Sequence, residues 1–255
     1  MPETIGNENA VSPKTRRQNE RTEARFFEDG NKVIAETESV AAGEYQPPNS
    51  ISTTVSLKTR RDASLAQRGI IQTDDADEEA GRNNRENLYK QMDKDLTRLV
   101  GYAKSAGKKE NEIAALESIS NKIKGVRAET IAEDDTNRHI SVSNRAYVSR
   151  ADNYSRFVEA YDALEIETSE DFYKADTHRD KAAEYQTANN RVITAEAKSN
   201  ASQSLYDQIT YTGDDSYLNA LISSKEYFKS KFKDTHYKNI AKTRFVMPSR
   251  LRKKK

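Results

Sequence analysis

Residues 86–125 read ENLYKQMDKDLTRLVGYAKSAGKKENEIAALESISNKIKG, and their apolar residues recur every three or four positions. This spacing places apolar side chains on one face of an α-helix. One such face runs from Leu88 to Ala106 and a second from Ile113 to Ile123, and each is followed by a glycine, Gly107 or Gly125. Glycine often terminates helices because it adopts left-handed backbone angles without strain. The stretch therefore predicts two helices joined by a short turn, the second from about Glu110 to Lys124, which form an antiparallel hairpin.

The same periodicity continues beyond an acidic connection over residues 126–141. It predicts a third helix from Ser143 to Leu164, a fourth from Phe172 to Thr210 and a fifth that contains Tyr217 to Phe228. The fourth has heptad spacing with small and polar residues at many seam positions, so we expect it to pack against the other helices rather than form a strong dimeric zipper. No sustained alternation of polar and apolar residues indicates a strand. The predicted fold is all-α, an antiparallel bundle of about five helices.

The upstream third of the chain has a different composition. Residues 1–72 hold four of the five prolines and few large apolar residues, and we predict that they form a mostly disordered polar arm with one helical stretch around Lys14 to Ala41. Five acids follow Thr73 within residues 74–79, which suits the positive end of a helix dipole. The helical bundle is therefore expected to span residues 73–245, and residues 246–255 are expected to form a basic disordered tail.

Two short sequences recur along the chain. The segment LYKQ at residues 88–91 resembles LYDQ at 205–208, and YAKS at 102–105 resembles YFKS at 227–230. A duplicated helical unit and chance similarity between amphipathic helices both explain this pattern.

Charge is segregated toward the C-terminal end. The last 31 residues contain twelve Lys and Arg against two acids, whereas the whole chain has a net charge of only +1. Such an end neutralises phosphates, and the interleaved Tyr237 and Phe245 are able to stack on unpaired bases. A solubilising tail would have the same composition. The candidate partner-binding residues are Lys238, Lys242, Arg244, Arg250, Arg252, Lys253, Lys254 and Lys255.

Local catalytic and cofactor motifs are absent from the sequence. None of the three histidines completes the Glu-x-x-His signature of di-metal bundles, and no phosphate-binding glycine motif or nucleophile elbow occurs. We therefore predict no catalytic residue, metal or cofactor. His178, at a seam position of the fourth helix, is either an acid–base group in a cleft or a hydrogen-bonded residue that sets helix register, and we favour the second interpretation.

Tyr147, Tyr154 and Tyr161 are spaced seven residues apart on the third helix. This spacing is typical of a core stripe whose hydroxyls reach the edge of the bundle, although a recognition stripe would have it too. We expect Tyr154 and Val158 to be buried.

The run Ser143-Asn-Arg-Ala-Tyr-Val-Ser-Arg-Ala-Asp-Asn-Tyr154, with Phe157-Val158, resembles a bacterial family of cytosolic helical-bundle proteins. The segments Leu99-Val100-x-Tyr102 and Lys122-Ile-Lys-Gly-Val-Arg127 are similar to it as well. The resemblance covers roughly residues 80–245. It implies a helical fold but no activity, because that family is uncharacterised and has none assigned.

These observations favour a non-catalytic cytosolic scaffold or interaction protein. Nucleic-acid or ribonucleoprotein binding through the basic end is one alternative, and an enzyme whose site is assembled from distant residues is another. A cytoplasmic location is expected because the chain has no cysteine, no apolar run near 18 residues and no apolar stretch typical of a secretory signal. A protein partner and self-association remain open, and membrane contact is not expected.

Overall fold

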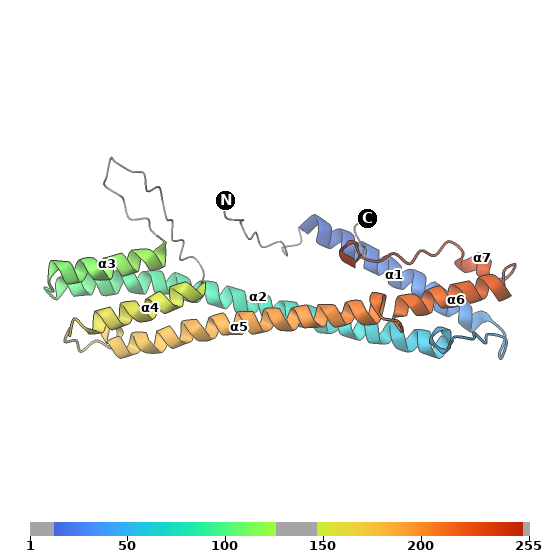
Figure 1. The fold of residues 1–255 in the computed structure, drawn as a ribbon, viewed down its shortest axis with the longest axis horizontal. Coiled ribbons are helices and arrows are strands. Elements are labelled where there is room, and N and C mark those ends of the chain that lie inside the picture. The colour runs from blue at the N-terminus through green and yellow to red at the C-terminus, as the bar shows by residue number, and fades with distance from the viewer. Residues whose placement is uncertain (1–12, 126–146, 252–255) are drawn as a thin grey trace. The chain divides into compact units, whose positions relative to one another are not determined.

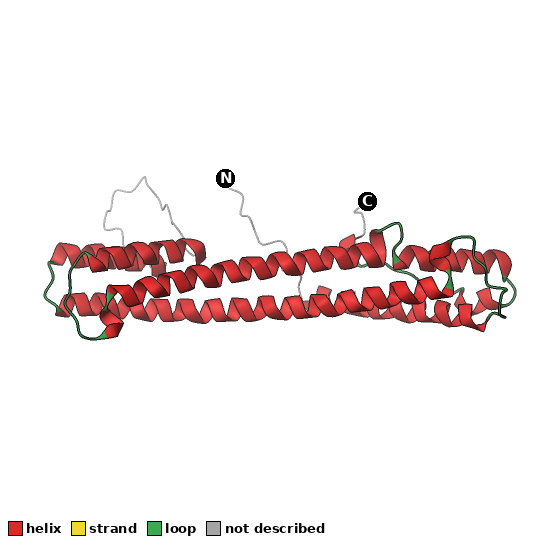
Figure 2. Cartoon of the chain, turned by 90° about the horizontal axis from the view of Figure 1, so that it is seen from below, coloured by secondary structure: helices red, strands yellow, loops and turns green. Residues whose placement is uncertain are grey.

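The structure, a computed structural model, describes residues 13–125 and 147–251, with side chains from residue 22 onward. All regular secondary structure in this part of the chain is helical, which confirms the predicted all-α fold (Figures 1 and 2). The chain divides into two compact units. Unit 1 comprises residues 1–73 and 200–255, and unit 2 comprises residues 74–199.

The helices are α1 (Pro13–Ser39), α2 (Thr54–Ser105), α3 (Glu110–Lys124), α4 (Tyr147–Asp162), α5 (Ala175–Asp207), α6 (Tyr217–Lys231) and α7 (His236–Ile240). Short 3₁₀ turns are η1 (Ser50–Ser52), η2 (Asp171–Tyr173) and η4 (Ser249–Leu251), and η3 (Gln208–Thr212) is a π-helical turn after α5. Helices α2 and α5 each contribute to both units. None of the described helices has the length and apolarity that crossing a bilayer requires.

The helical hairpin predicted from residues 86–125 is present in unit 2. Helix α3 begins and ends as predicted, and Gly107 and Gly125 adopt left-handed φ angles of 70° and 69°. At the start of α3 the Glu112 side chain accepts a hydrogen bond of 3.2 Å from the backbone N–H of Lys109. The sequence therefore contained both the start and the stop signals of this element.

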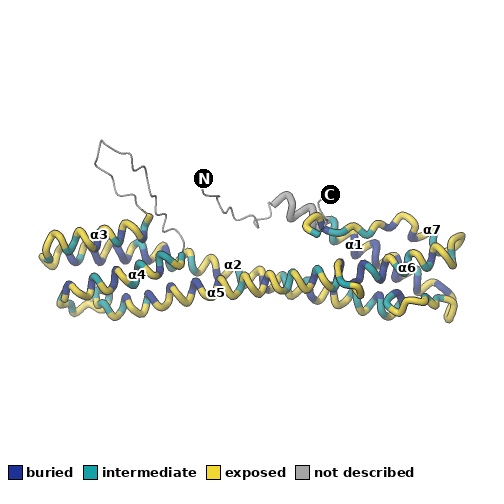
Figure 3. Tube along the Cα trace, in the orientation of Figure 1, coloured by how far each residue is buried: buried dark blue, intermediate teal, exposed yellow. Residues whose placement is uncertain are grey.

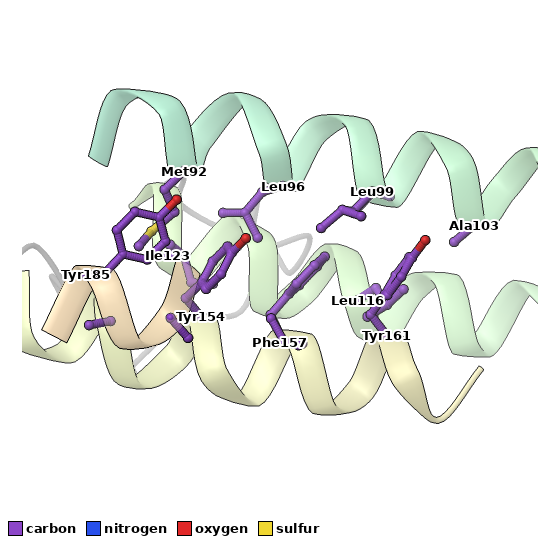
Figure 4. Close-up of a cluster of buried hydrophobic side chains, with 14 of the residues drawn as sticks. Met92, Leu96, Leu99, Ala103, Leu116, Ile123, Tyr154, Phe157, Tyr161 and Tyr185 are labelled. Atoms are coloured by element: carbon purple, nitrogen blue, oxygen red, sulfur yellow. The ribbon is translucent and has the colours of Figure 1, made fainter. Parts of the chain in front are cut away.

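The core of unit 2 forms where α2, α3 and α4 pack together. Leu96 and Leu99 of α2 point toward Tyr154 and Phe157 of α4, and Leu116 of α3 lies beside Tyr161 (Figure 4). All six side chains are at most 3% exposed. Val158 is 1% exposed, so the expected burial of Tyr154 and Val158 is confirmed.

The predicted start of the bundle at Thr73 is wrong, because α2 runs without interruption through residues 54–105. The acids after Thr73 bind α5 instead of capping a helix. The Asp74 carboxylate is buried and lies 2.8 Å from Lys198 Nζ, and the Asp75 carboxylate accepts a hydrogen bond of 2.7 Å from the Ser199 hydroxyl. Pairing with α5 offsets the cost of placing acids in the middle of a helix.

The helical stretch expected around Lys14 to Ala41 is present as α1, whereas the disorder expected for the rest of residues 13–72 is wrong. Residues 1–12 lie outside the described part of the chain. Helix α1 and the first part of α2 supply buried apolar side chains to unit 1, and α6 supplies many of their partners (Figure 3). Phe26, for example, is 1% exposed and packs edge-on against Tyr217 with ring centroids 5.6 Å apart. The few apolar residues of this region suffice because their partners come from the other end of the chain.

The predicted tail over residues 246–255 is likewise corrected as far as residue 251. Pro248 is buried, residues 249–251 form η4, and Met247 and Leu251 pack against the core of unit 1. The four residues after Leu251 lie outside the described part of the chain.

The recurring sequence segments occupy different structural settings. Leu88 and Tyr102 lie within one uninterrupted helix, α2, whereas Leu205 and Tyr227 are separated by η3 and a loop. A duplicated unit with a loop insertion would place its eight extra residues at this point, so the duplication stays a prediction.

Candidate partner-binding surfaces

His178 is part of the core of unit 2. Its ring is 0% exposed, Nε2 lies 2.6 Å from the Phe172 carbonyl oxygen, and Nδ1 lies 2.7 Å from the Tyr154 hydroxyl. A carbonyl only accepts, so Nε2 carries the proton and Nδ1 accepts the hydrogen bond from Tyr154. Burial lowers the pKa of His178, which favours this neutral form. Both nitrogens are used, which agrees with a buried, hydrogen-bonded residue rather than an acid–base group in a cleft; its role in setting helix register stays a prediction.

The nearest carboxylate to this histidine is also committed to the fold. Asp95 is 0% exposed, and its two oxygens lie 2.6 Å from Lys181 Nζ and 2.8 Å from Gln91 Nε2. A buried carboxylate needs such partners because an unpaired charge in the core costs several kcal/mol. Across residues 13–125 and 147–251, no three His, Asp or Glu side chains converge in a way that could hold a metal ion.

The tyrosine stripe of α4 is structural as well. Tyr154 and Tyr161 are buried, and the Tyr161 hydroxyl donates to the Tyr173 carbonyl at 3.1 Å. Burial raises the pKa of Tyr161 to about 12. Tyr147 is half-buried between the edge of the Tyr89 ring and the Arg85 guanidinium, which lies 3.9 Å from the Tyr147 ring centre. The core interpretation of the stripe is confirmed.

The basic C-terminal end lies in unit 1, and the structure divides its cations into two groups. The first group is engaged within the protein. Lys225 Nζ donates to the carbonyl oxygens of Ala241 and Thr243 at 3.0 and 2.7 Å, which holds the chain that follows α7. Arg250 forms a two-point contact with Asp207 of α5, with Nη2–Oδ1 at 2.7 Å and Nε–Oδ2 at 3.3 Å.

The second group is exposed. The side chains of Lys238, Lys242 and Arg244 face solvent and form no ion pair with any described residue. The predicted residues Arg252, Lys253, Lys254 and Lys255 lie outside the described part of the chain. The candidate set is thus separated into three accessible cations, one engaged cation and four residues whose positions the structure does not describe.

The aromatic residues of this end are not free to stack on bases. The Phe245 ring lies edge-on to Phe26 with centroids 6.4 Å apart, and Lys225 Nζ lies 5.8 Å from its centre. Tyr237 and Phe245 both pack against the core of unit 1. The expected stacking role therefore does not suit the folded state, whereas phosphate contact does.

A second surface, which the sequence reasoning missed, is the outward face of α5 within unit 2. Its outermost positions recur at spacings of four and three, are all exposed, and carry no charge: Ala183, Thr187, Asn190, Thr194 and Ala197. The neighbouring Ile193 is 54% exposed. The inward seam of the same helix, which includes Ala182 and Val192, dominates its sequence pattern. A search for a second heptad register in residues 175–199 would have found this face.

No family model, curated protein or solved structure matches the chain. The resemblance carried by residues 143–158 accordingly stays a prediction.

Proposed function

We propose that this protein is a non-catalytic helical scaffold or interaction protein, and that the outward face of α5 contacts a macromolecular partner. The observation that carries the proposal is the stripe of five exposed, uncharged positions between Ala183 and Ala197, which is flanked by the exposed charges of Glu184, Arg191 and Glu196. A third of the chain, 33%, is charged, and the solvated face of a helix usually takes its share of those charges. Alanine and threonine also let the backbone of another helix approach closely.

The use of His178 in the core supports this choice over an enzyme. The histidine was the strongest acid–base candidate in the sequence, and it has no free nitrogen with which to exchange protons with a substrate. Asp95, the nearest carboxylate, is held by Lys181. An enzymatic function would need other groups to converge from distant positions.

The test is to place charge on the α5 face of the full-length protein. Thr194→Arg with Ala197→Arg should abolish co-purification of partners that the wild-type protein retains, as measured by quantitative mass spectrometry. The control is Ala114→Arg with Ala115→Arg, which adds the same charge at exposed positions of α3 in the same unit. If both double variants retain the same proteins, the α5 face is not the contact surface.

A second candidate function is supported by the exposed cations of unit 1. We propose that Lys238, Lys242 and Arg244 bind the phosphate backbone of nucleic acid without base preference. Each phosphate contact releases counterions, so affinity should fall steeply with salt.

Fluorescence anisotropy with labelled single-stranded RNA at several salt concentrations tests this candidate. Replacing the three cations with glutamine should weaken binding and reduce the slope of log K against log salt by about 0.7 for each phosphate that is no longer bound. The matched control replaces Lys90, Lys94 and Lys104, which are exposed in unit 2. Undetectable binding of the wild-type protein at low salt would reject the candidate.

A further inference from the structure

Acids of α1 accompany the basic C-terminal segment along its course. Glu36 Oε1 lies 2.7 Å from His236 Nδ1 and accepts a hydrogen bond of 3.0 Å from the Asn239 side chain. Farther along, Asp29 Oδ2 accepts a hydrogen bond of 3.0 Å from the backbone N–H of Arg244. The contacts show that residues 236–250 follow α1 in the opposite direction, as is visible where the segment passes beside α1 (Figure 1).

The last of these contacts involves Arg250. Its Nη2 lies 3.6 Å from Glu23 Oε1, in addition to its two-point contact with Asp207. Only 15% of the Asp207 side chain and 12% of the Glu23 side chain are exposed. Burial raises the pKa of Glu23, so its carboxylate has lost hydration and Arg250 is one of two arginines that favour its charged form. The two acids together form an anionic seat for the Arg250 guanidinium, and the Arg250 side chain is 32% exposed there.

The carboxylate oxygens of this seat accept hydrogen bonds from Arg250 as the oxygens of a phosphate would. Arginine binds carboxylates and phosphates through the same planar pair of N–H donors. An arginine held by Asp207 and Glu23 is therefore unavailable to a polyanion, whereas Lys238, Lys242 and Arg244 in the same segment remain accessible.

The segment after α7 is attached by interactions that could be exchanged without unfolding the helices. Its polar attachments include the two Lys225 hydrogen bonds, the Arg244 N–H bond and the Arg250 pair. Of residues 241–251, only Thr243 and Pro248 are buried, and Phe245, Met247 and Leu251 are half-buried at the edge of the core.

We propose that Glu23, Asp29 and Asp207 act as an internal competitor of nucleic acid, so that phosphate binding by the basic end is autoinhibited until residues 241–251 leave α1. The inference rests on the second candidate function above. In this scheme the three exposed cations make the first contact with the nucleic-acid backbone. Release of the segment then adds Arg250 as a further phosphate contact.

The decisive variant is Glu23→Gln with Asp207→Asn in the full-length protein. It removes the charge of the seat and frees Arg250, so affinity for a labelled single-stranded RNA should rise by roughly threefold or more at 0.1 M salt, and the salt slope should steepen by about 0.7. The control, Glu28→Gln with Asp234→Asn, removes the same charge at exposed acids of unit 1. Adding Arg250→Gln to the decisive variant should return both affinity and slope to the wild-type values or below.

The outcomes separate the two proposals. If the wild-type protein binds RNA and the decisive variant behaves like the control, autoinhibition is wrong and the binding proposal stands. If neither the wild-type protein nor the variant binds, both proposals fail. Binding by the variant alone would also overturn both, because the three exposed cations would then make no first contact in the wild-type protein.

A measurement on the wild-type protein tests autoinhibition even if the decisive variant does not fold. Saturating RNA should accelerate hydrogen exchange of the Arg244 amide, because its bond to Asp29 breaks when the segment leaves α1. Exchange that is unchanged or slower with RNA bound would overturn autoinhibition.

Discussion

Unit 2 and unit 1 are both helical, but they are assembled from the sequence in different ways. The core of unit 2 takes closely spaced apolar residues from long amphipathic helices, such as Leu96 and Leu99 against Phe157. The core of unit 1 joins the two ends of the chain, with Phe26 and Phe27 of α1 against Tyr217 of α6. Local periodicity is therefore a sufficient guide to unit 2 and a poor guide to unit 1.

The largest effect should come from the dense core of unit 2. Replacing both Tyr154 and Val158 with alanine should lower the free energy of unfolding by roughly 5 kcal/mol, because it leaves cavities among α2, α4 and α5. Urea denaturation followed by circular dichroism measures this loss. Val148→Ala, at a position of α4 that is 52% exposed, is the control and should change stability by less than about 0.5 kcal/mol. A similarly small change in the double variant would contradict the assigned core.

A smaller loss is expected where α1 and α6 meet in unit 1. A Cβ atom added at Gly30 would lie 2.3 Å from the Tyr217 hydroxyl oxygen and 3.2 Å from Leu221 Cδ1. Gly30→Ala should therefore destabilise the protein by about 1–3 kcal/mol, the usual cost of overpacking, as measured by thermal unfolding.

The Tyr217 hydroxyl offers a rescue for this variant, because it is buried and forms no hydrogen bond with any described residue. Tyr217→Phe should cost little alone and restore part of the stability lost in Gly30→Ala. Equal losses in the single Gly30→Ala variant and the double variant would show that the two helices do not meet at these atoms.

The third effect is smaller and depends on pH. Burial lowers the pKa of His178 in the folded state, whereas the unfolded chain titrates near 6.5. As pH falls through 6.5, the unfolded chain binds a proton at His178 but the folded protein does not, so the free energy of unfolding decreases at lower pH. The slope cannot exceed the value for one proton, about 1.4 kcal/mol per pH unit.

Urea denaturation between pH 5.5 and 7.5 should show this loss in the wild-type protein and a flatter dependence in His178→Gln. The control is His236→Gln. Because His178 is intact in this variant, its stability should still fall toward acid by the amount that His178 contributes. Parallel curves for the wild-type protein and His178→Gln would mean that the histidine is protonated in the fold.

The difference between unit 2 and unit 1 also explains which parts of the fold could be predicted from the sequence. The bounds of α3 were predictable because Gly107 and Gly125 end helices and Glu112 caps the start of α3. The packing role of α1 was not predictable. Its apolar pairs are isolated in a polar stretch, and their partners lie far away in sequence, near residue 217. The acids after Thr73 were misleading because acids that cap a helix and acids that bind a neighbouring helix, as Asp74 and Asp75 do, give the same composition.

The candidate surface was predicted in part for a similar reason. Composition identified the basic end, including Lys238, Lys242 and Arg244, which the structure finds exposed. It could not separate these from Arg250, because the partners that occupy Arg250 are Glu23 and Asp207, distant in sequence. The outward face of α5 was missed because it is defined by the absence of charge at exposed positions, which requires knowing the buried face first.

The claim that connects the fold with the proposed regulation is that the basic C-terminal segment belongs to unit 1 and is bound along α1. Hydrogen exchange of the protein truncated after Ile240 tests this claim directly, with truncation after Leu251 as the control. We predict that loss of residues 241–255 accelerates exchange of α1 amides between Phe26 and Thr37, while amides of α4 in unit 2 keep their protection. If α1 exchanges at the same rate in both truncated proteins, the segment is a tail rather than a part of the fold, and the account is wrong.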